Sequence, residues 1–396
     1  MAVKLLPANN NNINSSARTI AATLLTLFST FCILHSSLAL TNIGNNYKYI
    51  HTNKYAYDVN DDPKVNVYGE NTRAIIGILS QEVSRFVQRN YPDEKYESYI
   101  AASYLKFVEG AGGRAVPIWI GQDKEYYVDI MSKINGVLLP GGSTFFNQSG
   151  GYAEASKHIY NIAIELNERG IYFPIWGTCL GFEVLIFLSS NGTDWRTECS
   201  SVGQALPLQF EKGYKDSRLF APASEEILYY LSTFNVTVNF HIFCYTKETF
   251  AQHDLNKIWQ VMSVNHDWNG VEFISTVEHR KYPFYAVQYH PEKILYEFVP
   301  NRNITHTTNA VLVSQYFANF FVNEARKNQQ KFNDPTEEIN TLFYNYHPVY
   351  TGAKGSSYAQ LYLFKSRNPS SAASMSAEAT KLRSLFTLIT LFILVS

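Results

Sequence analysis

Short apolar runs alternate with amphipathic segments through the first half of the chain. Four runs have the character of strands buried on both faces of a sheet: AIIGIL from residue 74, RAVPIWI from 114, GVLLPGG from 136 and YFPIW from 172. Helical spacing of apolar residues marks the segments 101–108, 124–134, 152–169 and 180–188. Repeated β–α units predict an α/β fold, with a mostly parallel sheet flanked by helices and ligands at the C-terminal ends of the strands.

The second half of the chain is less regular. The segments EFISTVEH, from residue 272, and FYAVQYH, from residue 284, are predicted to pair as strands through a turn at RKYP. A helix is predicted over 311–326. The formal net charge of -1 gives no electrostatic argument for binding nucleic acid, and the composition, with 15% aromatic and 17% charged residues, is that of a globular protein.

The N-terminal segment has the three parts of a secretory signal peptide. Lys4 and Arg18 precede an apolar run over 20–34, and Ser37, Leu38 and Ala39 then form a small-x-small cleavage site. Residues 1–39 are therefore predicted to be a signal peptide. A retained membrane anchor is the alternative.

The C-terminal segment, residues 367–396, resembles a lipid-attachment signal. Small residues at 370–374 are followed by a mostly polar spacer and an apolar tail over 385–395, which is too short to span a bilayer comfortably. This order predicts a GPI-attachment signal, with the attachment residue among 370–374. A disordered tail with an apolar end is the alternative.

The chain carries glycosylation sequons and an odd number of cysteines after the predicted leader. The sequons predict glycans at Asn147, Asn191, Asn235 and Asn303. Removal of Cys32 with the leader leaves Cys179, Cys199 and Cys244, so at least one cysteine is unpaired within the chain. A bond between Cys199 and Cys244 would leave Cys179 free, although sequence alone cannot give the geometry.

Cys179 lies in the pattern GTCLG, between a predicted strand and a predicted helix. A G-x-C-x-G turn at such a junction is the cysteine form of a nucleophile elbow, which exposes the sulfur at the edge of the sheet. The N-terminus of the following helix favours the thiolate, and the amide of Leu180 is placed to bind an oxyanion. A packed structural cysteine in a turn is the alternative.

Two further motifs supply the partners that such a nucleophile needs. In QYHPEK, His290 and Glu292 are two residues apart on a backbone that Pro291 is expected to hold extended, so both side chains would face one site. His290 would take the thiol proton and Glu292 would orient its ring. In LPGG, the amide of Gly142 is a second candidate oxyanion donor. A solvent-exposed strand end and an ordinary β–α loop are the respective alternatives.

The order of these motifs resembles the class I glutamine amidotransferase-like superfamily: glycine-turn loop, elbow cysteine, then His-x-Glu. Longer segments, including YIAASYLKFVEGAGGRAVPI, FPIWGTCLGFE and EFISTVEHRKYPFYAVQYHPEK, resemble the gamma-glutamyl hydrolase family over residues 63–365. The resemblance implies a three-layer, flavodoxin-like sandwich and a catalytic domain over 60–366. It also implies a secretory-pathway protein, lysosomal or extracellular. The segment after residue 365 does not match the family, which leaves attachment to the cell surface open.

The resemblance also assigns roles to individual residues. Cys179 would be the nucleophile, His290 the proton-transfer residue and Glu292 the third member of the triad. His241, in NFHIF, matches a family histidine near the substrate site, whereas the residues alone favour a packed histidine. The implied substrates are folyl and antifolyl poly-γ-glutamates, and the chemistry needs no cofactor. No HExxH or CxxC pattern indicates a metal site.

Two other functions fit parts of the sequence. A glutaminase that feeds ammonia to a synthetase would share the triad but would need a partner domain, for which this chain has no sequence. A catalytically inactive surface protein would account for the sequons and the C-terminal tail, but not for an intact triad. The sequence leaves open whether the protein dimerises, whether cleavage is exo or endo, and which chain length is preferred.

Overall fold

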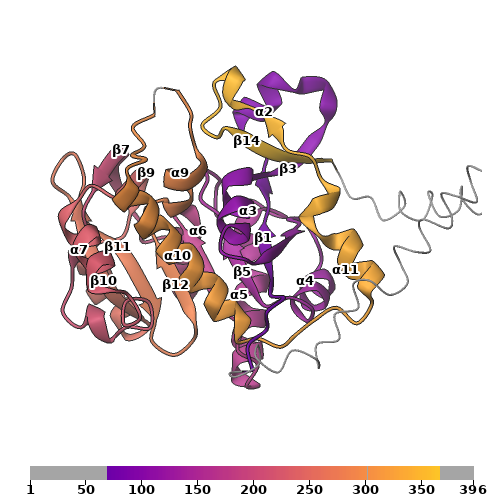
Figure 1. Cartoon of the computed structure of the whole chain (residues 1–396). Coiled ribbons are helices and arrows are strands. Elements are labelled where there is room, and N and C mark those ends of the chain that lie inside the picture. The colour runs from indigo at the N-terminus through magenta and orange to yellow at the C-terminus, as the bar shows by residue number, and fades with distance from the viewer. Residues whose placement is uncertain (1–68, 301, 366–396) are drawn as a thin grey trace, which may run out of the picture. The chain divides into compact units, whose positions relative to one another are not determined.

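The computed structural model describes residues 69–300 and 302–365 (Figure 1). The predicted signal peptide, 1–39, and the predicted C-terminal extension, 367–396, lie outside the described residues. Among the helices that the structure describes, none combines the length and apolar character needed to cross a bilayer.

An eight-stranded sheet forms the centre of the described part, in the order β4-β1-β5-β6-β12-β11-β10-β8. Its parallel strands are β4 (Arg114–Ile118), β1 (Ile75–Leu79), β5 (Gly136–Leu139), β6 (Ile175–Thr178) and β12 (Phe284–Val287). Its antiparallel edge consists of β11 (Glu272–His279), β10 (Trp259–His266) and β8 (Gln209–Phe210). The predicted mostly parallel sheet and the predicted pairing of β11 with β12 are confirmed.

Helices cover both faces of this sheet. Successive strand residues point to opposite faces, so Ile76 and Ile75 of β1 enter two different apolar cores. The first core is completed by α3 (Ala102–Glu109), α7 (Glu225–Thr233), α9 (Pro291–Tyr296) and α10 (Thr308–Arg326). The second is completed by α4 (Lys124–Met131), α5 (Tyr152–Glu168), α6 (Leu180–Ser189) and α8 (Lys247–Gln252). The result is the predicted three-layer sandwich, with α10 packed beside α9 (Figure 1).

Two smaller sheets, which the sequence did not predict, lie beside the main one. A four-stranded antiparallel sheet has the order β13 (Val349–Tyr350), β14 (Gln360–Lys365), β3 (Tyr96–Ala101) and β2 (Gln81–Glu82). An antiparallel ribbon consists of β7 (Thr197–Leu206) and β9 (Thr237–Cys244). Two short helices, α2 (Arg85–Asn90) and α11 (Pro335–Thr341), complete the α-helices of the described chain. These peripheral sheets matter because they supply walls of the cavity described below.

A disulfide closes one end of the ribbon. Cys199 of β7 is bonded to Cys244 of β9, with their Cα atoms 6.0 Å apart. The pairing that would leave Cys179 as a free thiol is therefore confirmed.

Candidate active site

Cys179 occupies a strained turn between β6 and α6. Its backbone angles are φ 51° and ψ -104°, which a residue with a side chain rarely adopts. The Cys179 N–H donates to the carbonyl of Val287 (2.8 Å), and the Cys179 carbonyl accepts from the N–H of Glu183 (2.9 Å). These bonds hold the turn between β12 and the first turn of α6. The predicted strand-to-helix elbow is confirmed.

The two glycines of GTCLG allow backbones to approach each other closely. A Cβ atom on Gly181 would lie 2.0 Å from the carbonyl oxygen of Leu139, in the neighbouring strand β5. A Cβ atom on Gly177 would lie 2.6 Å from the carbonyl oxygen of Gly181. Real Cβ atoms do not make such contacts, so only glycine lets α6 start directly against the sheet.

His290 and Glu292 form a hydrogen-bonded pair in the structure. The Nδ1 atom of His290 and the Oε1 atom of Glu292 are 2.7 Å apart, and both side chains are buried. The extended backbone predicted for this pair is wrong. Strand β12 ends at Val287, His290 is the N-cap of α9, and Pro291 is the first residue of that helix, where its fixed φ is favourable and its missing N–H costs nothing. The helix turn, rather than strand alternation, brings the carboxylate to the ring.

The loop after β5 places its glycines against Cys179 and His290. A Cβ atom on Gly141 would lie 2.7 Å from Cε1 of His290 and 3.1 Å from Cβ of Cys179. The side chains of Cys179 and His290 therefore both lie next to this glycine, and both line the same cavity.

Polar side chains fix the orientation of the same loop. The Gly141 N–H donates to the hydroxyl of Tyr104 (2.8 Å), and the Gly141 carbonyl accepts from Nε2 of Gln81 (2.9 Å) and from the hydroxyl of Tyr358 (3.4 Å). The bond between Gly141 and Gly142 is trans, so holding this carbonyl also fixes the direction of the Gly142 N–H on the opposite side. Gly142 lines the cavity that contains Cys179, where a candidate oxyanion donor should lie.

Burial keeps the resting cysteine and histidine in their neutral forms. Burial raises the pKa of the Cys179 thiol and Glu183 raises it further, whereas Lys293 and the Leu180 N–H at the sulfur lower it. Burial also lowers the pKa of His290, against the opposing effect of Glu292. The helix N-terminus was expected to favour the thiolate. In the structure its contribution is smaller than that of burial, so the sulfur needs a base to lose its proton.

Glu292→Gln is expected to lower kcat/KM by about 10²- to 10⁴-fold, because the amide cannot stabilise a cationic ring. It should also move the acid limb of the pH profile to lower pH. The Glu292 carboxylate raises the pKa of His290, so its loss lets burial lower that pKa further. The measurement is kcat/KM from about pH 4 to about pH 8 for both proteins. An acid limb that stayed in place or moved to higher pH would contradict this role.

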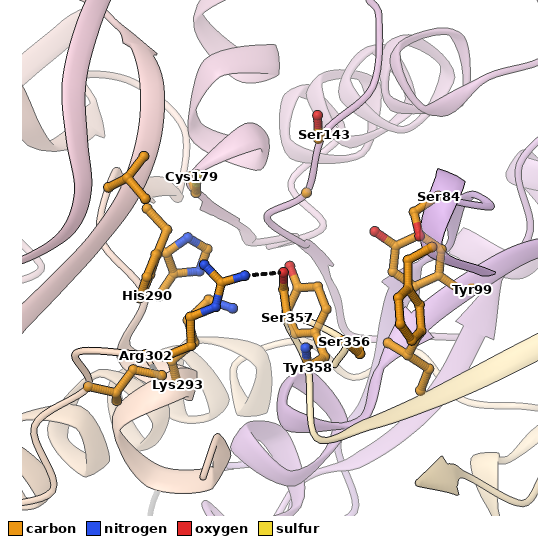
Figure 2. Close-up of a pocket in the computed structure, with 16 residues that line it drawn as sticks. Ser84, Tyr99, Ser143, Cys179, His290, Lys293, Arg302, Ser356, Ser357 and Tyr358 are labelled. Carbon is orange, nitrogen blue, oxygen red and sulfur yellow. Dashed lines mark hydrogen bonds between the residues drawn. The ribbon is translucent and has the colours of Figure 1, made fainter. Parts of the chain in front are cut away.

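A cavity of about 310 Å³ opens above the sulfur. Figure 2 shows Cys179, His290, Lys293 and Arg302 on one side, Ser84 and Tyr99 on the other, and Ser356–Tyr358 between them. The lining also includes apolar residues from α2, the smaller sheets and a nearby loop, namely Phe86, Val202, Phe240, Ile304 and Leu361. The cavity thus combines a buried nucleophile and base with apolar walls and two cationic side chains.

His241 lies behind this lining. It follows Phe240 on β9, and successive strand residues point to opposite faces, so Phe240 lines the cavity while His241 packs against Phe273. Its Nδ1 atom is 3.1 Å from the carbonyl oxygen of Phe243, and burial, with a smaller effect of His290, lowers its pKa to about 3. The substrate contact expected of His241 stays a prediction.

Two other carboxylates, Glu183 and Glu82, have protein partners. Glu183 is buried and accepts from Arg196 Nη1 (2.7 Å) and Gln288 Nε2 (3.0 Å). Glu82 accepts from the N–H of Tyr152 (2.8 Å), the first residue of α5, and so satisfies that helix end. Both oxygens of Glu183 thus have protein partners, whereas Oε2 of Glu82 is buried without a hydrogen-bond partner among the described residues.

Sequence reasoning did not single out the two cations of the cavity. Lys293 directly follows Glu292 in HPEK, so it would have been found had the first helical turn been recognised there. Arg302 lies in a loop with no periodic pattern.

No group of histidine, cysteine or acidic side chains suited to a metal ion is present among residues 69–300 and 302–365. The sequon asparagines are all exposed, as glycosylation requires: Asn147, Asn191, Asn235 and Asn303.

Comparison with known proteins places this geometry in a family. The peptidase C26 family model matches residues 74–292. Gamma-glutamyl hydrolase of Homo sapiens is 43% identical over 293 residues, which cover 74% of this chain and 90% of that protein. Gamma-glutamyl hydrolase B of Dictyostelium discoideum is 38% identical, covering 74% of this chain and 84% of that protein.

A solved structure of PurLQS from Thermotoga maritima is also similar, at 15% identity and a TM-score of 0.36, covering 63% of this chain and 99% of that chain. The matched range, 74–292, includes Cys179, His290 and Glu292, and the match to the hydrolases extends over most of the chain. The chain belongs to the peptidase C26 family and, within it, to the gamma-glutamyl hydrolases that it matches over most of its length.

Proposed function

We propose that this protein is a cysteine-type γ-glutamyl hydrolase that cleaves the poly-γ-glutamate chains of folates and antifolates through a thioester. One observation carries the proposal: a free thiol on a strained elbow shares a cavity with a histidine that is bonded to a carboxylate. The sequence identity of 43% and 38% to two gamma-glutamyl hydrolases supports the γ-glutamyl bond as the bond that is cleaved. The chemistry requires no cofactor.

The first half of the reaction forms the thioester. His290 takes the proton of Cys179, and the resulting imidazolium is stabilised by Glu292. The thiolate attacks the γ-carbonyl carbon, and the N–H groups of Leu180 and Gly142 donate to the developing oxyanion. The carbon–nitrogen bond then breaks, and His290 returns its proton to the departing amine.

The second half releases the acyl group. His290, neutral again, takes a proton from a water molecule that attacks the thioester carbonyl carbon. The same N–H groups stabilise the second tetrahedral intermediate. The carbon–sulfur bond breaks, the sulfur recovers the proton from His290, and the glutamyl product leaves as a carboxylic acid.

The direct test offers the purified protein a pteroyl poly-γ-glutamate and, separately, glutamine. We expect products shortened by glutamate units, identified by mass, and little release of ammonia from glutamine. The reverse pattern would favour a glutaminase. No turnover of either compound would overturn the proposal.

We also propose that the protein is glycosylated and works in the secretory pathway, in a lysosome or outside the cell. The disulfide Cys199–Cys244 supports an oxidising compartment, and the sequon asparagines are accessible. A lower apparent mass after removal of N-linked glycans would support this location.

Release from cells by a phosphatidylinositol-specific phospholipase would support the GPI anchor. Sedimentation of the purified protein would determine whether it is a homodimer.

A further inference from the structure

Arg302 stands at the exposed end of the cavity that holds Cys179. It belongs to the loop between α9 and α10, and its side chain is exposed, whereas Cys179 and His290 are only 4% and 2% exposed. The sulfur of Cys179 therefore lies at the buried end of the cavity, and the guanidinium of Arg302 lies at its exposed end. A substrate held at the sulfur must extend past Arg302 if it leaves the cavity at this end.

The guanidinium of Arg302 is available to an anion. The structure gives it one hydrogen bond, to Oγ of Ser357 (2.8 Å), and a position 5.9 Å from the centre of the Phe240 ring. Figure 2 shows this hydrogen bond crossing from Arg302 to the loop that carries Ser357. A guanidinium has five N–H donors, so one neutral hydroxyl leaves most of them for a ligand.

A second cation lies deeper in the same cavity. Lys293 of α9 is buried, and its Nζ atom lies 3.9 Å from the centre of the Tyr358 ring. Burial lowers the pKa of Lys293, carboxylates at Glu292 and Glu297 oppose this, and the positive charge of Arg302 adds to the lowering. The guanidinium of Arg302 and the basic side chain of Lys293 therefore line one cavity, a lining that suits an anionic substrate.

A poly-γ-glutamate chain offers anions in the right form. Each peptide bond uses the γ-carboxyl group, so every unit keeps a free α-carboxylate. A carboxylate matches the planar fork of arginine, which can bind both oxygens at once. Because Arg302 is at the mouth, the carboxylate that reaches it belongs to a unit outside the one held at Cys179.

We propose that Arg302 binds the α-carboxylate of such an outer γ-glutamyl unit and so makes the enzyme prefer longer chains. The inference rests on the proposed function and adds a residue that determines chain-length specificity. If the inference is correct, Arg302 lowers KM for long chains and leaves kcat nearly unchanged, because its contact with the substrate is remote from the reacting bond.

The test compares the wild-type protein with Arg302→Met on a diglutamyl and a pentaglutamyl form of the same p-aminobenzoyl substrate. We expect the variant to raise KM for the pentaglutamyl chain by about 10-fold, as for one partly exposed charged hydrogen bond, with kcat little changed. KM for the diglutamyl substrate should change less than about 2-fold. Arg302→Lys should restore part of the difference, and added salt should reduce it.

Arg169→Met is the matched control. Arg169 is exposed and lies at the C-terminal end of α5, away from the cavity lining. The Arg169→Met substitution therefore removes the same charge as Arg302→Met without removing a contact to the substrate. It should keep both KM values. An equal KM in wild type and Arg302→Met for the long chain would overturn the inference, as would an equal rise for both substrates. Failure of the wild-type protein to cleave either substrate would overturn the proposed function itself, and the inference with it.

Discussion

Replacing Cys179 with alanine is expected to abolish γ-glutamyl hydrolysis while leaving the protein folded. Cys179 is the free cysteine of the described chain and the nucleophile of the proposed reaction, and no other thiol can form the thioester there. Removing one buried sulfur atom costs roughly 1–2 kcal/mol of unfolding free energy, which a domain with two large apolar cores tolerates. The measurements are turnover of a pteroyl poly-γ-glutamate and the thermal unfolding midpoint.

Ser156→Ala is the matched control for this variant. Ser156 is fully buried on α5, away from the cavity lining, and its hydroxyl makes no hydrogen bond among the described residues. The control therefore also removes one buried heavy atom, and it should keep full activity. Substantial turnover by a folded Cys179→Ala protein would exclude the thioester mechanism. Loss of activity in both variants, with lowered unfolding midpoints, would show that packing rather than chemistry was responsible.

The parts of the fold that the sequence predicted are those encoded by neighbouring residues. Continuous apolar runs gave the parallel strands, and the GTCLG pattern gave the elbow with Cys179 at its apex. The glycines on either side of Cys179 belong to the same short segment, so the close backbone approach that they permit has a local signature. Local patterns were therefore sufficient to place Cys179 at the turn between β6 and α6.

The predicted contact between His290 and Glu292 is present, but the local structure predicted for it is wrong. FYAVQYH continues as an alternating apolar pattern to His290, so the strand was extended across HPEK. Proline is equally compatible with the first turn of a helix, and the structure has that helix, α9. Both conformations bring His290 and Glu292 together. Only the helix also places Lys293 in the cavity lining.

The walls of the cavity could not be predicted because they depend on contacts between distant segments. Strand β14, at the C-terminal end of the described chain, pairs with β3, and the loop before it supplies Ser357 and Tyr358. The ribbon of β7 and β9 supplies Val202 and Phe240. No periodic signal links residues so far apart, and the loop that carries Arg302 has no regular structure. The short motifs therefore predicted the residues that share one site, whereas the residues that form the cavity walls could not be predicted.

His290→Ala is expected to lower kcat/KM by about 10³- to 10⁶-fold, because His290 is the base that takes the thiol proton in the proposed mechanism. The residual activity should depend on pH in a way that the wild-type activity does not. Burial raises the pKa of Cys179, so without a base the thiolate is scarce at neutral pH and grows about tenfold for each pH unit below that pKa. The wild-type rate should be nearly flat over the same range, because burial also lowers the pKa of His290 and keeps the base neutral.

The measurement is kcat/KM between about pH 6 and about pH 9, together with the rate of alkylation of Cys179 by iodoacetamide. Both should rise steeply with pH in the variant, since both report the thiolate. His253→Ala is the control, because His253 stacks on Trp195 outside the cavity lining and should affect neither rate. A His290→Ala protein whose residual activity was independent of pH would show that the sulfur loses its proton to another group. The pairing of His290 with Cys179 would then be structural, and Glu292 would have no ring to orient during catalysis.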